Sequence, residues 1–300
     1  MPVLTTRSEL LRKRVDAFTR ALRGAERGDA GALHRARVAS RRLRELLPVL
    51  QLDHGTAGKL NRRLRKVTDR LGAVRELDVL LLLIDELQVS RRARIAGLAL
   101  IGIAVAQERT DARKRLSRHL PIKDMRRVAA KLDGIADDLA AEEKSRAANR
   151  SRSWRWAIDA RIARRASCLG AALQATGSVY LPERLHAVRI AIKKLRYALE
   201  LSSDAADSQR AAEVRALKRG QDVLGRMHDL QGLIERVRQE QASLAPPNVA
   251  IWRDLDAIVV SLEDDCRRLH GRFMGARDGL AAVAAKAGRD QSVHTTRRVS

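Results

Sequence analysis

The segment LHRARVASRRLRELL at residues 33–47 returns as LHAVRIAIKKLRYAL at residues 185–199, and this repetition decides the fold. The two copies share a histidine and four cationic positions in one constant register, which chance rarely preserves. Such internal self-similarity indicates two homologous structural units that pack together. The matched positions are His34 and His186, Arg37 and Arg189, Arg41 and Lys193, Arg42 and Lys194, and Arg44 and Arg196.

A second matched segment follows each copy of the first. LRKVTDRLGAVRELD at residues 64–78 aligns with LKRGQDVLGRMHDLQ at residues 217–231, after one inserted residue. The final stretch, GRDQSVHTTRRVS, lacks apolar periodicity and is typical of a solvated, disordered terminus. The boundaries we predict are 5–287 for a single domain, about 5–121 and 151–287 for its two repeats, 122–146 for a connecting helix and 288–300 for the disordered tail.

The composition predicts an all-α protein. Hydrophobic residues make up 45% of the chain and charged residues 32%, which fits a folded protein, while aromatic residues reach only 2%. Ala, Leu and Arg dominate and favour helices over strands. Gly and Pro clusters interrupt the helical periodicity at regular places. The helices we expect span residues 5–27, 30–51, 57–88, 90–119, 122–146, 151–176, 182–203, 206–243 and 248–287.

The net charge points to a polyanionic partner. The chain has 60 Lys and Arg against 36 Asp and Glu, a net charge of +24. A surface this basic attracts polyanions. Modules that bind single-stranded nucleic acid stack bases on aromatic rings, so the shortage of aromatic residues weighs against that class.

The cysteines and the apolar runs exclude other classes. Cys168 and Cys266 lie far apart outside any metal-binding motif, so they predict neither a disulfide framework nor a zinc site. A reducing cytoplasm is the expected location. The longest apolar stretch, residues 95–106, is shorter than the roughly 18 residues that span a bilayer, and the N-terminus is charged throughout. We therefore expect no membrane insertion.

The repeated segment places its polar residues on one side of a helix. At 100° per residue, His34, Arg37, Arg41 and Arg44 fall within an arc of about 80°. The other side carries apolar residues that would pack into a bundle. Long cationic stems can flank such an apolar seam while their charged heads line a groove. The apolar positions are Leu43 and Leu47 in the first copy, and Val188, Ile192, Leu195 and Leu199 in the second.

The next helix of the first half adds a second basic stripe. Its five cations fall within about 100° around the helix axis. Like charges this close repel one another and destabilise a bundle unless an anion neutralises them, which favours a bound ligand. The stripe is Lys59, Arg62, Arg63, Lys66 and Arg70. The second half keeps Arg215, Arg219 and Arg226 but has Ala212, Ala216 and Val223 at matching places.

A solvated charged face is the ordinary explanation of one basic stripe. Such a face requires only polarity, so Glu, Gln or Asp would serve as well as Arg. Both copies instead keep cations at four matched positions beside a matched histidine. We therefore favour an anion-binding site over a solvated face.

His34 and His186 have three possible roles: a structural hydrogen-bonding residue, a phosphate donor that responds to pH, or a metal ligand. The metal role is the weakest, because each histidine is followed by cations on its own face. A phosphate donor fits better, since imidazole titrates near pH 6.5. For the neighbouring carboxylates we favour an orienting role toward the cations over acid–base or metal chemistry. These acids are Asp69, Glu76, Asp78, Asp222 and Asp229, with Arg75 and Asp78 paired at i, i+3.

These motifs resemble the CHAD family, the conserved-histidine α-helical domains, over roughly residues 5 to 287. The resemblance rests on LHRARVASRRLR, LHAVRIAIKKLRYALE, LGAVRELDVLL and the looser LGRMHDLQGLI. It implies two pseudo-symmetric antiparallel helical bundles enclosing a basic groove that binds inorganic polyphosphate, often at polyphosphate granules. It also implies that the matched histidines and cations of the first repeated segment line that groove.

The second half departs from the first at two positions. His228 stands where the first half has Arg75, and Gln231 stands where it has Asp78, so that this Arg/Asp pair occurs once. Some relatives carry a triphosphatase-like domain with a Glu-x-Glu-x-Lys motif. This chain has neither the motif nor the length for that domain, so the resemblance does not imply hydrolysis.

The sequence as a whole predicts a non-enzymatic polyphosphate-binding protein of the cytoplasm, located at polyphosphate granules, with no cofactor, metal or catalytic residue. Nonspecific binding to a nucleic-acid backbone is the alternative, and a phosphohydrolase or metal-binding protein comes third. The predicted binding residues are His34, Arg37, Arg41, Arg42, Arg44, Lys59, Arg62, Arg63, Lys66, Arg70, Arg75, His186, Arg189, Lys193, Lys194, Arg196, Arg215, Lys218, Arg219, Arg226 and His228.

Overall fold

The computed structural model describes residues 5–27, 29–89, 95–119, 122–145, 147–206, 210–244 and 248–296. These residues form helices joined by short connections and include no strand, so the all-α prediction is confirmed. The helices are α1 (Arg7–Glu26), α2 (Ala30–Leu46), the 3₁₀ helix η1 (Leu47–Val49), α3 (His54–Val89), α4 (Ile95–His119), α5 (Ile122–Ser145), α6 (Ala147–Thr176), α7 (Pro182–Ala206), α8 (Ala211–Ser243) and α9 (Val249–Thr296).

Local sequence accounts for several helix ends. Thr6 caps α1 by accepting a hydrogen bond from the Glu9 amide at 3.2 Å, while the Glu9 carboxylate accepts one from the Thr6 amide at 2.8 Å. Asp29 caps α2 in a related way and accepts from the Gly31 amide at 2.8 Å. The chain leaves α6 at Gly177, whose φ of 60° lies in the region that glycine adopts without strain.

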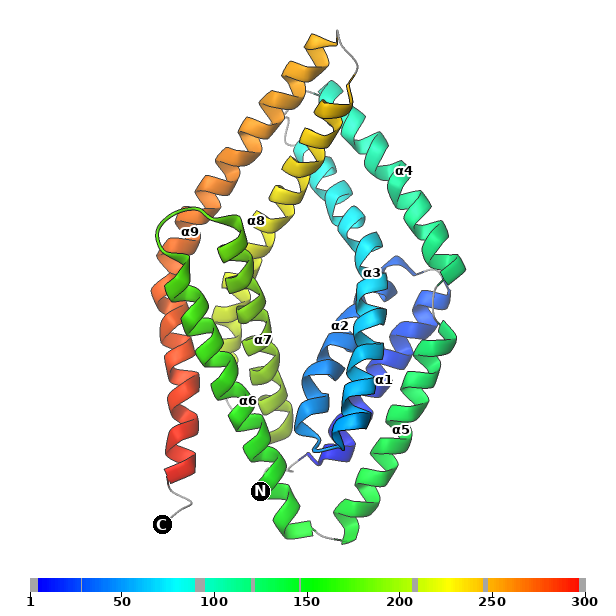
Figure 1. The fold of residues 1–300 in the computed structure, drawn as a ribbon, viewed down its shortest axis with the longest axis vertical. Coiled ribbons are helices and arrows are strands. Elements are labelled where there is room, and N and C mark those ends of the chain that lie inside the picture. The colour runs from blue at the N-terminus through cyan, green and yellow to red at the C-terminus, as the bar shows by residue number, and fades with distance from the viewer. Residues whose placement is uncertain are drawn as a thin grey trace.

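The helices form an open diamond with the two halves side by side (Figure 1). In the first half α1 packs on α2 and α2 on α3, and in the second half α6, α7 and α8 pack in the same order. In the first half α4 packs on α3, and α5 returns along α1. In the second half a single helix, α9, packs on α8 and returns along α6, in place of the two helices α4 and α5. The helix α9 has 48 residues, about as many as α4 and α5 together, which have 25 and 24.

The domain and repeat bounds stay predictions from the sequence. The helix expected at residues 122–146 is present as α5, which leads toward α6 and also packs along α1. The tail expected to be disordered from residue 288 is helical through Thr296, because α9 continues beyond the fully buried Ala287. Residues 297–300 of that tail lie outside the described part of the chain.

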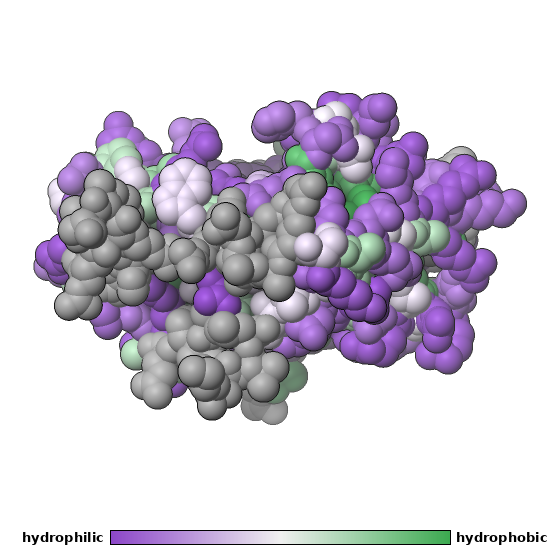
Figure 2. All heavy atoms as spheres, turned by 90° about the horizontal axis from the view of Figure 1, so that it is seen from below, coloured by the Kyte–Doolittle hydropathy of each residue, from purple (hydrophilic) through white to green (hydrophobic). Residues whose placement is uncertain are grey.

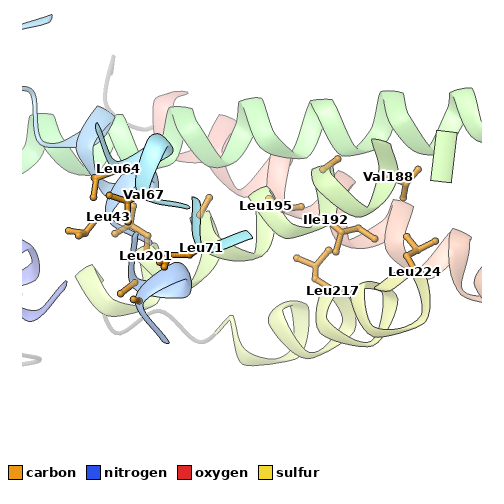
Figure 3. Close-up of a cluster of buried hydrophobic side chains, with 14 of the residues drawn as sticks. Leu43, Leu64, Val67, Leu71, Val188, Ile192, Leu195, Leu201, Leu217 and Leu224 are labelled. Atoms are coloured by element: carbon orange, nitrogen blue, oxygen red, sulfur yellow. The ribbon is translucent and has the colours of Figure 1, made fainter. Parts of the chain in front are cut away.

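The predicted apolar faces are buried. Leu43 of α2 packs in a cluster with residues of α3, and Ile192 and Leu195 of α7 pack with Leu217 of α8 (Figure 3). These side chains have almost no exposed surface. The polar positions between them therefore point away from the core of each half.

Cations of one half meet acids of the other along the seam between the halves. Glu45 at the end of α2 accepts from Arg161 and Arg165 of α6, at 2.6 and 3.2 Å. Apolar contacts also join the halves, for example where Leu80 lies against Gly232. The other ion pairs across the seam are Arg42 with Glu200, Lys13 and Arg14 with Asp204, Arg226 with Glu86, and Arg236 with Glu108.

The outer surface seen from the lower end of the molecule is largely hydrophilic, with small apolar patches (Figure 2). Among the described helices, none combines the length and the apolar character needed to cross a membrane.

The seam yields a prediction about stability. Glu45 is only 13% exposed and holds two arginines that are each 18% exposed. Replacing the acid by an amide leaves a buried guanidinium without its counter-charge, which typically costs about 3 kcal/mol. We expect Glu45→Gln to lower the free energy of unfolding by about that amount in urea denaturation.

Asp137→Asn provides the matched control. Asp137 is 73% exposed and pairs with an exposed Arg12, and such pairs contribute at most about 1 kcal/mol. Equal losses in the two variants would contradict a buried role for Glu45.

Candidate anion-binding site

Four cations converge where the halves meet at α2 and α7. We call Arg37 and Arg41 of α2, together with Arg189 and Lys193 of α7, the central basic cluster. Arg41 is close enough to Arg189 and Lys193 to lower the pKa of both, after the larger effect of burial. The basic side of α2 and the matching basic side of α7, both predicted from the repeated segment, therefore face each other across the seam.

A glycine lies beside each of the two arginines Arg37 and Arg189, and it is tightly approached only at Arg37. A Cβ atom added to Gly72 of α3 would lie 3.0 Å from Arg37 Nη1, so a larger residue would push the guanidinium away. Gly225 of α8, the matched glycine, lies under Arg189, with 3.9 Å from the added Cβ to Nε. The absence of a side chain at position 72 thus lets the Arg37 guanidinium lie close to α3.

The cluster keeps donors without acceptors. Arg37 Nη1 and Arg189 Nε are buried and have no hydrogen-bond partner. Buried donors without a partner typically cost about 1–3 kcal/mol each. The Arg37 and Arg189 guanidinium groups are therefore incompletely hydrogen-bonded in the free protein.

The cluster also brings like charges together in a partly buried place, which costs free energy. Burial, followed by the charges of Arg189, Arg41 and Arg37, lowers the pKa of Lys193 from its ordinary 10.5 to about 7. Burial likewise lowers the pKa of Arg37 and of Arg189. The free protein thus holds cations that an anion would stabilise.

The nearby carboxylates lie where they moderate this repulsion. Glu76 and Asp69 of α3 act against the lowering of the Arg37 pKa, and Asp229 of α8 does the same for Arg189. Burial raises the pKa of Asp229 itself, against the opposing effect of Arg189. The predicted orienting role therefore fits the placement of these three acids.

Asp78 behaves differently from the prediction. It was expected to pair with Arg75, one turn before it on the same helix. Its carboxylate instead accepts from Arg109 of α4 at 2.5 Å and lies 3.6 Å from Arg113. The Arg75 guanidinium remains near His34 and Asp229, whose pKa values it lowers, so it belongs with the cluster.

The histidines flank the cluster at both ends. Burial and then Arg75, Arg37 and Arg41 lower the pKa of His34. At the other end the rings of His186 and His228 lie 4.9 Å apart between centroids. Burial, followed by Arg189 and His186, lowers the pKa of His228 to about 4.

These shifts keep His228 neutral at pH 7, so that it can donate one hydrogen bond without adding charge. Within the described residues, no group of three or more His, Cys, Asp or Glu side chains is arranged to hold a metal ion.

Other residues of the predicted site serve the seam. Arg42 and Arg196 both bind Glu200, and Arg196 Nε also donates to Gln221 at 3.1 Å. Arg44 donates to Asn61 at 3.1 Å, and Lys194 is exposed beside the cluster. Arg42 therefore helps to position α2 against α7, Arg196 is held within the second half, and both are less available to an anion.

The second basic stripe lies on a surface apart from the central basic cluster, so its part in ligand binding stays a prediction. Arg63, Lys66 and Arg70 of α3 line a pocket of 240 Å³ against α5. Lys59 and Arg62 are exposed on α3, and Lys59 lies near Asp53. In the second half Arg215, Lys218 and Arg219 are exposed on α8, whereas Arg226 pairs with Glu86 of α3 at 2.7 Å.

Sequence reasoning missed residues beside both surfaces. Arg127 of α5 lines the α3/α5 pocket, but residues 122–146 were taken as a connector. A pocket of 180 Å³ next to His186 and His228 includes Tyr180, whose hydroxyl accepts from Gln231 at 2.5 Å. Gln231 occupies the position that matches Asp78 of the first half. This difference between the two repeats was the signal in the sequence for a pocket that the first half lacks.

Comparison with known proteins identifies the family. The CHAD domain model matches residues 9–238, so the chain belongs to the CHAD domain family. Two solved structures share the fold. PptA from Streptomyces chartreusis aligns with a TM-score of 0.61 and 19% identity, covering 90% of this chain and 97% of that one. The CHAD domain from the plant Ricinus communis aligns with a TM-score of 0.61 and 22% identity, covering 95% and 93%.

No curated protein matches this sequence significantly. The recognition of the family from its repeated motifs is thus confirmed, together with the helical fold. The internal duplication remains a prediction from the sequence, although the matching order of helix contacts supports it.

The buried lysine yields a prediction about pH. Because the unfolded chain keeps the Lys193 proton up to a pKa of about 10.4 and the folded chain releases it near 7, the unfolded state binds more protons between these values. This site therefore destabilises the protein most below about pH 7, and less as the pH rises above 7. We expect Lys193→Met to raise the free energy of unfolding at pH 7, with a smaller gain at about pH 9.

Lys194→Met is the control, because Lys194 neighbours Lys193 in sequence but is exposed. Urea denaturation at the two pH values measures both variants. A stability change that is the same for both, or that does not depend on pH, would rule out a strained cation at position 193.

Proposed function

We propose that this protein binds inorganic polyphosphate at the central basic cluster. The observation that carries the proposal is the convergence of Arg37 and Arg41 with Arg189 and Lys193, including buried donors without partners. Polyphosphate presents a charge on nearly every phosphate and acceptor oxygens all along its chain. Guanidinium groups bind such oxygens through forked, charge-assisted hydrogen bonds.

Binding would relieve the strain of the free site. An anion near Lys193 raises the pKa of that ammonium, so the site takes up protons as ligand binds near neutral pH. Neutral His34 and His186 would add uncharged donors at the ends. The family resemblance favours the same ligand, since it implies a basic groove that binds polyphosphate.

We propose a binding role without catalysis. The cluster consists of cations that stabilise bound charge, and its nearest acids, Glu76, Asp69 and Asp229, lie beside those cations. A location at polyphosphate granules in the cytoplasm follows from the proposed ligand. Nonspecific binding to a nucleic-acid backbone is the second candidate, because the same cations can neutralise a duplex.

A competition titration tests the ligand. We expect long-chain polyphosphate to displace fluorescent duplex DNA when both are present at equal phosphate concentration and near-physiological salt. The reason is that a flexible chain without bases can follow a narrow array of cations more closely than a rigid duplex. If DNA displaced polyphosphate under these conditions, nucleic-acid binding would replace the proposal.

A paired substitution tests the site. Arg37→Gln with Arg41→Gln removes two charged contacts, each typically worth about 1.5–3 kcal/mol, so we expect polyphosphate affinity to fall about 100-fold or more. The melting temperature should stay equal or rise, because the cluster loses internal repulsion.

Arg267→Gln with Arg268→Gln removes the same charge from exposed positions on α9, where each arginine pairs with an aspartate on its own helix. Isothermal titration calorimetry compares the two double variants. Equal affinity losses would mean that net charge, and not the central basic cluster, governs binding.

A further inference from the structure

The pocket between α3 and α5 is a second surface of the right chemistry for an anion. We call Arg63, Lys66 and Arg70 of α3, with Arg127 of α5, the outer basic pocket. Val67 and Val128 form its floor, and its volume is 240 Å³. The single acid on its rim, Asp124, lies 3.6 Å from Arg127 in an exposed i, i+3 pair.

The outer basic pocket lies on a different side of α3 from the central basic cluster. At 100° per residue, Arg63, Lys66 and Arg70 fall within about 60° of one another. Their mean direction is about 150° from that of Gly72, which lies against Arg37. Two different phosphate segments would therefore be needed to reach both surfaces.

Two exposed cations elsewhere on this protein show how acids can offset such charge. Arg12 binds Asp137 at 2.6 Å, and Arg126 of α5 binds Glu26 at 2.7 Å. Among the described residues, no carboxylate forms an ion pair with any of the three α3 cations of the outer basic pocket. Four cations face one acid there, an excess that a bound anion would offset.

The fold itself does not require this charge. At the positions matching Arg63 and Arg70, the second half has Ala216 and Val223, and its helix α8 packs between α7 and α9 all the same. Arg63 and Arg70 therefore have no cationic counterpart in the second half, although Lys66 matches Arg219, and this difference points to a ligand in the first half.

We propose that the outer basic pocket is a second phosphate-binding site, separate from the central basic cluster, so that one protein molecule holds two segments of polyphosphate. This inference rests on the proposed function for the kind of ligand. Two sites on different sides of one rigid body cross-link separate chains, or bind one long chain with greater avidity. The protein would then condense polyphosphate as well as bind it.

Stoichiometry with a short ligand tests the inference. Tripolyphosphate is too short to reach both surfaces, so calorimetry should count two molecules per wild-type protein. Arg63→Gln with Lys66→Gln and Arg70→Gln should reduce the count to one, as should Arg37→Gln with Arg41→Gln. The matched control, Arg267→Gln with Arg268→Gln and Arg272→Gln, removes the same charge from α9 and should keep two.

Light scattering with long-chain polyphosphate provides the second readout. Wild type and the α9 control should form large assemblies at ratios where the triple variant of the outer basic pocket stays in small complexes. Circular dichroism checks that all variants remain helical, which their exposed positions favour.

The outcomes separate the two proposals. One tripolyphosphate per wild-type molecule, lost only in the Arg37/Arg41 variant, would overturn the second site and leave the proposed function standing. Binding that is lost only in the triple variant of the outer basic pocket would instead overturn the central site. Unchanged scattering by that triple variant would overturn cross-linking through this pocket.

Discussion

The rest of the structure depends on one constraint: positively charged side chains of α2 and α7 lie close together where the two halves meet. Arg37 and Arg41 face Arg189 and Lys193 closely enough for burial and mutual repulsion to bring the pKa of Lys193 to about 7. Such a contact opposes association of the two halves. Other interactions must therefore hold the halves together around it.

The seam supplies those interactions on both sides of the cluster. Glu45, Glu200 and Asp204 each form ion pairs with cations of the opposite half. Leu80 of α3 also packs against Gly232 of α8. The ring of helices also closes where α4 meets α9 and where α5 leads into α6 (Figure 1). Because attractive contacts surround the repulsive one, the two halves can hold four cations close together.

Much of this could be predicted from the sequence, because helices and their apolar faces depend on local periodicity. The repeated segment also identified the four cations of the central basic cluster. The placement of Arg63, Lys66 and Arg70 could not be predicted, since it depends on where α5 packs and α5 was taken for a connector. Likewise, Arg75 and Asp78 satisfy the i, i+3 rule, but α4 offers Asp78 stronger partners in Arg109 and Arg113. Tertiary packing decided both cases.

The two halves reach the same fold with unequal ends, and the differences follow the departures between the repeats. At the first end Arg75 places a permanent charge near His34, while at the other end its counterpart His228 is neutral at pH 7 and lies against His186. Gln231, in the position of Asp78, binds the Tyr180 hydroxyl and closes a pocket where the first half has an ion pair. The positive potential is thus stronger at the end of the central basic cluster where Arg75 and His34 lie. An anionic chain lying along the cluster meets two chemically distinct ends.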